Sequence, residues 1–195
     1  MGRGRRVRPG PPGGARPARR TRAAGLVPGQ PRQRQRPGEK GGELTGPNPT
    51  DRAKRGTKYH LLVDRAGLPL NVAVSGANRN DCLQVQPLLD SMPAIRRGGR
   101  GHPRRRPVKL HADKAYDIPW VRRYLHRRGI TARIPRRGRD PNGRLGRHRW
   151  VVERTLGWLL SYKRLALRYD RTARTITALA RLAVTLICAR RLLTH

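Results

Sequence analysis

The sequence predicts an α/β fold in which a mixed β-sheet is flanked by helices, and three observations support this prediction. Two strand-like runs at residues 57–63 and 68–74 are separated by an Asp-Arg-Ala-Gly turn, which predicts an antiparallel hairpin. Helical and strand-like patterns then alternate along the chain. Two runs near the end, at residues 150–162 and 175–193, carry apolar residues at helical spacing. This order of elements is expected of a mixed sheet with helices packed on it.

Short elements are expected between the hairpin and the two C-terminal helices. They are a helix at residues 82–91, a basic linker at residues 96–107, a strand at residues 109–111, a helix at residues 119–128 and a strand at residues 131–135. Asp81 and Asp117 precede the two helices and are interpreted as their N-caps, because a short carboxylate can accept from the N–H groups of a first turn. Gly129 is interpreted as the C-terminal stop of the second helix.

The first 39 residues differ in composition from the rest of the chain. Residues 1–38 contain no acidic and no aromatic residue, and they consist mainly of Arg, Pro, Gly, Ala and Gln. Such a segment buries too little apolar area to offset the entropy of ordering the chain. We therefore expect a disordered basic segment at residues 1–39 and one folded domain at residues 40–195.

The charge balance is extreme, because 46 Lys and Arg stand against 11 Asp and Glu and give a formal net charge of +35. Such an excess favours binding to nucleic acid through counterion release, and overuse of Arg in a GC-rich genome is the alternative explanation. Cys82 and Cys188 lack the spacing of a zinc site or a disulfide framework. No apolar run is long enough to span a bilayer or resembles the core of a signal peptide, so a cytoplasmic protein is expected.

Two carboxylates are candidates for chemistry. Asp113 follows the strand predicted at residues 109–111, where a side chain can face a ligand, although a loop anchor neutralised by Lys114 is the simpler interpretation. Glu153 lies in the helix predicted at residues 150–162 and is expected on its packed side; a salt bridge with Arg149 is the simpler interpretation there. Together, in so basic a chain, the two acids suggest a hard cation, Mg²⁺ or Mn²⁺, acting on phosphodiesters. Such a site usually needs a third carboxylate to bridge two metal ions.

Four segments carry a resemblance to a known family. They are Lys-Gly-Gly-Glu-Leu-Thr-Gly-Pro-Asn-Pro-Thr-Asp-Arg at residues 40–52, Lys-Tyr-His-Leu-Leu-Val-Asp at 58–64, Leu-His-Ala-Asp-Lys-Ala-Tyr-Asp at 110–117 and Leu-Gly-Arg-His-Arg-Trp-Val-Val-Glu-Arg-Thr at 145–155. In this order they resemble the catalytic half of DDE-type insertion-sequence transposases. The resemblance implies a ribonuclease-H-like fold, a divalent metal ion, and DNA cleavage and strand transfer by in-line attack on phosphodiesters. It also implies DNA partners, namely transposon ends and target, and a homo-oligomer when ends are brought together.

The resemblance assigns roles to individual residues. Asp113 matches the second Asp of the catalytic and metal-binding triad, and Glu153 matches its glutamate. Arg149 matches an arginine found four residues before that glutamate. The side chains expected to contact DNA are Arg147, Arg149, Arg154, Lys163 and Arg164.

The chain departs from the family pattern in two respects. Some relatives have Tyr where this chain has Gly146 and Lys where it has Leu160, and the nearest bases here are Lys163 and Arg164. The larger departure is that the first Asp of the triad is missing. In relatives it ends a central strand, which would place it near Arg32.

The absence of that Asp shapes the functional prediction. Nothing before residue 39 shows the alternation of a typical strand, so the central first strand is expected to be missing, with a frameshift as the hypothesis for its cause. Asp51 in a Pro-rich loop and Asp64 in the hairpin turn are poor substitutes. Without the first Asp of the triad, the resemblance implies a chain that cannot transpose by itself. The alternative is a non-catalytic basic protein that binds DNA or RNA, and a ribosomal-type protein is a third and weaker interpretation.

Overall fold

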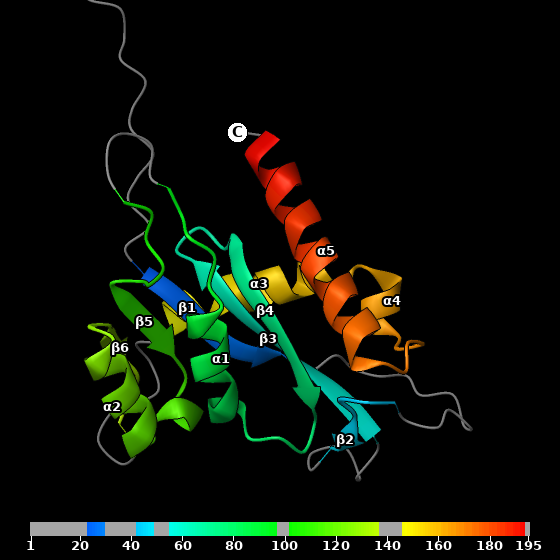
Figure 1. The fold of residues 1–195 in the computed structure, drawn as a ribbon, viewed down its shortest axis with the longest axis horizontal. Coiled ribbons are helices and arrows are strands. Elements are labelled where there is room, and N and C mark those ends of the chain that lie inside the picture. The colour runs from blue at the N-terminus through cyan, green and yellow to red at the C-terminus, as the bar shows by residue number, and fades with distance from the viewer. Residues whose placement is uncertain (1–22, 30–41, 49–54, 97–101, 137–145, 194–195) are drawn as a thin grey trace, which may run out of the picture.

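The computed structural model describes residues 23–29, 42–48, 55–96, 102–136 and 146–193. Within them one sheet has the strand order β2-β3-β1-β5-β6, and β4 pairs with β3 outside this path. The strands are β1 Ala23–Gly29, β2 Gly46–Pro47, β3 Arg55–Asp64, β4 Pro69–Gly76, β5 Lys109–Ala112 and β6 Thr131–Arg133. β3 runs antiparallel to β1, β2 and β4, whereas β1, β5 and β6 are parallel. The mixed sheet predicted from the sequence is confirmed (Figure 1).

The expectation that the central first strand is missing is wrong. Residues 23–29 form β1, which lies between β3 and β5 and bonds to both, so its backbone groups are satisfied by two neighbours. The pairing of β1 with β5 ends at Leu26, and beyond it β1 pairs with β3 alone. Pro28, which has no backbone N–H, lies in this last part of the strand, where the missing donor is tolerated. The same strand corrects the expectation of disorder across residues 1–39. The other residues of that segment lie outside the described ranges.

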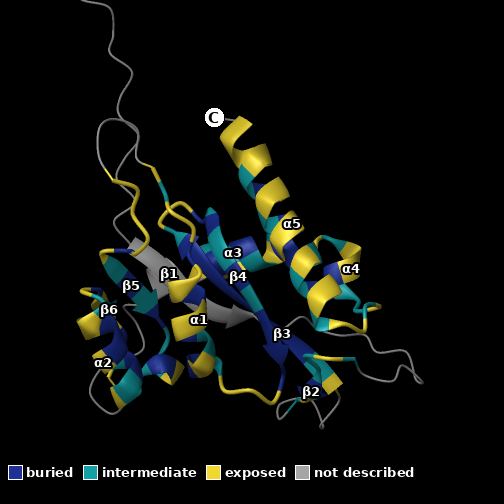
Figure 2. Ribbon diagram, viewed as in Figure 1, coloured by how far each residue is buried: buried dark blue, intermediate teal, exposed yellow. Residues whose placement is uncertain are grey.

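Helices cover both faces of the sheet, because the strands bury apolar side chains on each side. The helical elements are η1 Asp81–Gln84, α1 Val85–Asp90, η2 Lys114–Tyr116, α2 Pro119–Arg127, α3 Gly146–Leu160, α4 Lys163–Ala166 and α5 Ala173–Leu193. Alternate residues of β3 divide between the two cores: Leu62 packs with α1 and α2, while Tyr59 and Leu61 pack with α3, α4 and α5. Figure 1 shows α1 in front of the sheet and α3 behind it, and in Figure 2 β3 is buried along most of its length. This arrangement is the mixed sheet with helices packed on it that the sequence predicts.

The predicted hairpin is confirmed, and two predicted caps are wrong. Asp64 holds the turn between β3 and β4, where its Oδ1 accepts from the backbone N–H groups of Ala66 at 2.9 Å and Leu68 at 2.8 Å. Asn80, not Asp81, caps η1, and Asp81 instead pairs with Lys58 at 3.0 Å. Asp117 does not cap α2 but binds Arg122, with 2.6 Å between Oδ1 and Nε. In the folded chain each carboxylate binds a cation and not a helix N-terminus: Asp81 binds Lys58, and Asp117 binds Arg122.

The Gly-Glu-Leu-Thr-Gly segment at residues 42–46 packs against the start of α5. Glu43 accepts from the backbone N–H of Ala173 through Oε2 at 2.6 Å, and its own N–H donates to the Arg171 carbonyl at 2.7 Å. Arg168 joins the two segments through the Glu43 carbonyl and the hydroxyl of Thr45. A Cβ at Gly42 would lie 2.3 Å from the Arg171 carbonyl oxygen, so only glycine fits this contact.

Candidate active site

Asp113 lies at the carboxyl end of β5, as predicted. It is the N-cap of η2, and its Oδ1 accepts from the backbone N–H of Ala115 at 2.8 Å. The residue is partly exposed. This bond confirms the loop-anchor interpretation for one oxygen of Asp113. The bond does not exclude ligand binding, because a carboxylate has several acceptor positions.

A buried tyrosine lies under this turn. Tyr116 is fully buried, and its hydroxyl has no hydrogen-bond partner among the described residues. Burial raises its pKa well above the ordinary value, and the negative charges of Asp81 and Asp113 raise it further. Both carboxylates thus lie close enough to act on the Tyr116 hydroxyl, and the elements that they flank, η1 and η2, pack together.

β1 lies beside the end of β5 and contributes no acid. The parallel register pairs Leu26 with Ala112, so the next position along β1, Val27, lies beside Asp113. No residue of β1 is acidic. The first acid of the family pattern was expected near Arg32, which lies outside the described residues.

Glu153 lies on α3, and its predicted orientation is wrong. It is exposed, while Val152, Thr155 and Leu159 of the same helix are buried. Helix α3 packs against β1 and β3, so the helix that carries Glu153 and the strand end that carries Asp113 both adjoin β1. An exposed carboxylate on this helix remains able to reach a ligand in solvent.

The predicted DNA-contacting residues occupy different environments. The side chains of Arg147 and Arg149 lie outside the described part of the chain. Arg154 is held between Trp150 and Trp158, at 4.5 and 4.9 Å from the ring centroids, and donates to the Ala66 carbonyl at 2.7 Å. Its guanidinium therefore fixes α3 to the β3–β4 turn.

The two bases on α4 face solvent. Lys163 and Arg164 are exposed, and Arg164 pairs with Asp170 at 2.7 Å. An exposed pair of this kind contributes little to stability, so both side chains can turn toward an anionic ligand.

A buried polar cluster beside η1 was not predicted from the sequence. His60 is fully buried and its Nε2 lies 2.8 Å from the Ser75 Oγ, while Lys58 on the same face of β3 donates to Asp81 and to the Arg79 carbonyl. Burial lowers the pKa of His60 to about 4; Asp81 opposes this shift and Lys58 adds to it. The sequence signal for this cluster is weak: Lys58 and His60 alternate with Tyr59 and Leu61 in the strand, a pattern that is typical of a solvated face.

The donors available for a metal ion are carboxylate oxygens. Among the described residues, no group of three or more His, Cys, Asp or Glu side chains is arranged to hold a metal ion. Asp113 and Glu153 fit a hard cation such as Mg²⁺ by the chemistry of their oxygens, with the remaining ligands supplied by water or substrate phosphates.

Comparison with known proteins decides the family. Residues 24–188 match the family described as Transposase DDE domain, which includes β1 and all elements through most of α5. The chain belongs to the DDE transposase family. It therefore belongs to a class of proteins that carries out DNA transposition. The helices of the described residues include none that could cross a membrane.

Individual relatives of this DDE transposase agree with the match. The transposase assigned to insertion sequence element IS402 of Burkholderia cepacia is 47% identical over 144 residues, covering 74% of this chain and 68% of the relative. The transposase assigned to IS6501 of Brucella ovis is 31% identical over 140 residues, covering 69% of this chain and 98% of the relative. Among solved structures, the catalytic core domain of BIV integrase is 16% identical, with a TM-score of 0.45 over 84% of this chain and 81% of that chain.

Proposed function

We propose that Asp113 and Glu153 of this DDE transposase hold Mg²⁺ or Mn²⁺ in the remaining part of a site that, when complete, cleaves and joins DNA strands. One observation supports this most: Asp113 ends β5 directly beside β1, and α3, which carries Glu153, packs on the same strand. A divalent ion bound there would activate an attacking oxygen and stabilise a leaving one. Transposon ends and target DNA are the proposed substrates, in the cytoplasm.

The residues of the chain have distinct tasks in this proposal. The Asp113 oxygen bonded to the Ala115 N–H fixes the direction of the carboxylate at the end of β5. Glu153 approaches from the exposed side of α3. Lys163 and Arg164 hold DNA phosphates, together with Arg147 and Arg149, and Arg154 acts mainly through the position of α3.

The proposed site is incomplete, because β1 contributes no acid. Without a bridging carboxylate, the two ions of a phosphodiester-cleaving site lack a shared ligand. We propose that the chain therefore does not catalyse strand transfer by itself. A homo-oligomer at paired DNA ends would share this deficiency, since every copy lacks the same group.

Binding of Mn²⁺, followed by calorimetry and by electron paramagnetic resonance, tests the two carboxylates. Asp113→Asn and Glu153→Gln should each weaken Mn²⁺ binding at least tenfold. Asp90→Asn is the matched control, because Asp90 is an exposed acid on α1 that binds Tyr124. Equal Mn²⁺ affinity in all four proteins would refute the proposed site.

A restoration experiment tests the missing ligand. Val27→Asp places a carboxylate on β1 beside Asp113 and should raise Mn²⁺ affinity and allow metal-dependent nicking of a labelled duplex. Leu26→Asp, one position away, is the control, because neighbouring residues of a strand face opposite sides of the sheet. Robust strand transfer by the unmodified chain would contradict the proposed deficiency.

The missing acid on β1 also favours a second function, a basic protein that binds nucleic acid without catalysis. In that case DNA affinity should be the same with and without a chelator, and Asp113→Asn should leave it unchanged. The Mn²⁺ titration separates the two functions.

A further inference from the structure

A groove lies at the sheet edge, between the C-terminal half of α2 and β6. It encloses about 1010 Å³ and is lined by Arg122, Arg123, His126, Arg127 and the segment 129–132. Arg123, His126 and Arg127 are exposed on α2, and none of the lining residues is acidic. We refer to it as the α2–β6 groove.

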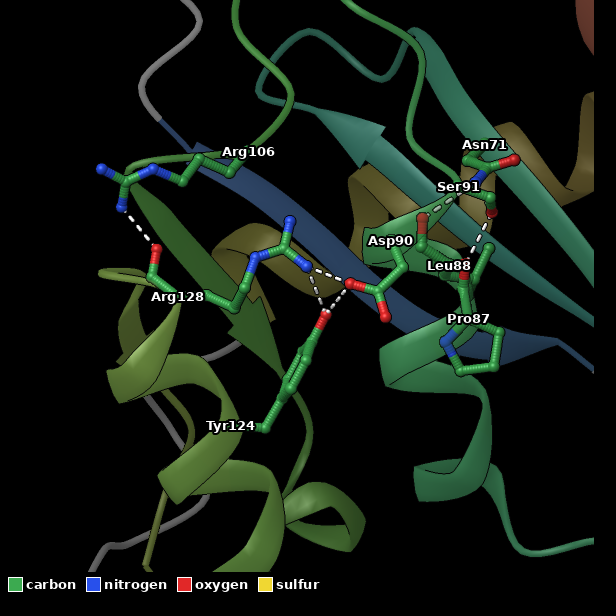
Figure 3. A network of polar contacts seen from close by, with 8 residues as sticks. All are labelled: Asn71, Pro87, Leu88, Asp90, Ser91, Arg106, Tyr124 and Arg128. Atoms are coloured by element: carbon green, nitrogen blue, oxygen red, sulfur yellow. Dashed lines mark hydrogen bonds and ion pairs between the residues drawn. The ribbon is translucent and has the colours of Figure 1, made fainter.

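The acids nearest the groove are already paired with other groups. Asp117 binds Arg122, which also donates to the Ile134 carbonyl at 2.9 Å. On the other side of α2, Asp90 accepts from the hydroxyl of Tyr124 and pairs with Arg128 (Figure 3). Neither acid is available to neutralise Arg123 and Arg127, which make no ion pair with the described residues.

The end of α2 is also neutralised. The last carbonyls of a helix carry partial negative charge, which would repel an anion in the groove. Arg106 donates through Nη1 to the carbonyls of Arg128 and Gly129, as Figure 3 shows for the first of these. Gly129 has a φ of +61°, which turns the chain from α2 directly into β6.

The backbone adds few donors to the lining. The N–H groups of Gly129, Ile130 and Thr131 already donate to the carbonyls of His126, Leu125 and Val108. Thr131 is exposed at the start of β6 and adds a hydroxyl. Arginine side chains and a hydroxyl around one concave surface are donors that DNA-binding proteins use on phosphates.

The groove is separate from the candidate active site. Thr131 pairs with Lys109 at the start of β5, whereas Asp113 follows its end. Asp113 lies four residues after Lys109, which at roughly 3.3 Å per residue is about 13 Å along the direction of β5. This length corresponds to about four base pairs of a duplex.

We propose that the α2–β6 groove binds the phosphate backbone of duplex DNA, a few base pairs from the candidate active site. The proposal rests on the proposed function in taking DNA as the substrate. It requires no sequence recognition, because contacts to phosphates carry none directly. The groove would hold the DNA duplex along the sheet edge, near the strand end that carries Asp113.

Fluorescence anisotropy with a labelled 20-base-pair duplex, titrated with NaCl, tests the groove. The double variant Arg123→Gln/Arg127→Gln should bind at least tenfold more weakly, and its slope of log affinity against log salt should fall by about 2, as expected for two lost phosphate contacts. The control is Arg174→Gln/Arg181→Gln, which removes two exposed arginines of α5. Arg123→Lys/Arg127→Lys keeps the charge and should keep the salt slope.

The outcomes separate this inference from the proposed function. Mn²⁺ binding should be unchanged in the groove variant, and a circular dichroism melt establishes that it is folded. If the groove variant and the α5 control lose equal affinity, or if duplex RNA or anionic lipid vesicles bind more tightly than DNA, the inference is overturned. Loss of DNA binding in the groove variant alone would support it, even if Mn²⁺ fails to bind at Asp113.

Discussion

His60 predicts an acid-sensitive fold. Its imidazole is fully buried, bonds to Ser75 through Nε2 and has no partner for Nδ1 among the described residues. Burial lowers its pKa from 6.5 to about 4, so the folded protein resists protonation where the unfolded chain accepts it. Stability linked to His60 is therefore full above pH 6.5 and falls as the pH drops from 6.5 to about 4.

The expected loss follows from these two pKa values. At pH 5 a histidine of the unfolded chain is almost entirely protonated, while folded His60 is almost entirely neutral. Linkage then predicts that the free energy of unfolding falls by about 2 kcal/mol between pH 7 and pH 5 on account of this residue.

Urea denaturation at pH 7 and pH 5 measures this change. The wild-type protein should lose about 2 kcal/mol more than His60→Leu between the two values, whereas His126→Gln should behave like the wild type, because His126 is exposed. Comparing variants removes the contribution of Asp64, whose pKa burial raises. An equal pH dependence in wild type and His60→Leu would refute the reasoning.

Two further predictions concern stability, and urea denaturation checks both. Tyr59→Phe should cost about 1 kcal/mol, because the buried Tyr59 hydroxyl donates to the Leu165 carbonyl at 3.0 Å, whereas Tyr116→Phe should cost nothing or stabilise. A larger cost at Tyr116 would contradict this. Gly42→Ala should destabilise by about 1–3 kcal/mol, because its Cβ meets backbone. Gly157→Ala should stabilise by up to about 1 kcal/mol, because its Cβ meets nothing within 4 Å at an exposed position inside α3. Effects of the same sign at the two glycines would argue against the packing described for the loop.

Local patterns predicted the elements whose structure is decided locally. The β3–β4 hairpin was predictable because Asp64 supplies acceptors to its own turn, and α2 because its apolar residues recur at helical spacing. β1 was not predictable in this way. It lies among arginines and contains Pro28, and only its pairing with β3 and β5, which follow it in sequence, makes it a strand.

The site was predictable in its residues but not in its surroundings. Asp113 could be placed at a strand end from the abrupt change to charge after the strand. The exposure of Glu153 could not be predicted, because it depends on which side of α3 meets the sheet. Asp81 and Asp117 were interpreted as caps because each precedes a predicted helix. Their actual partners, Lys58 and Arg122, could not be identified from the sequence, because they approach only in the folded chain.

The bond between Glu43 and the first turn of α5 has a consequence for synthesis. Its two partners are separated by 130 positions in the chain, so a ribosome must release nearly the whole domain before the contact can form. Until then, the face of β3 and β4 that α5 covers stays open to other chains. A product that ends before residue 173 would keep Asp113 and Glu153 but would leave that face uncovered. Such a product is expected to aggregate or to be degraded, even though both candidate site residues are present.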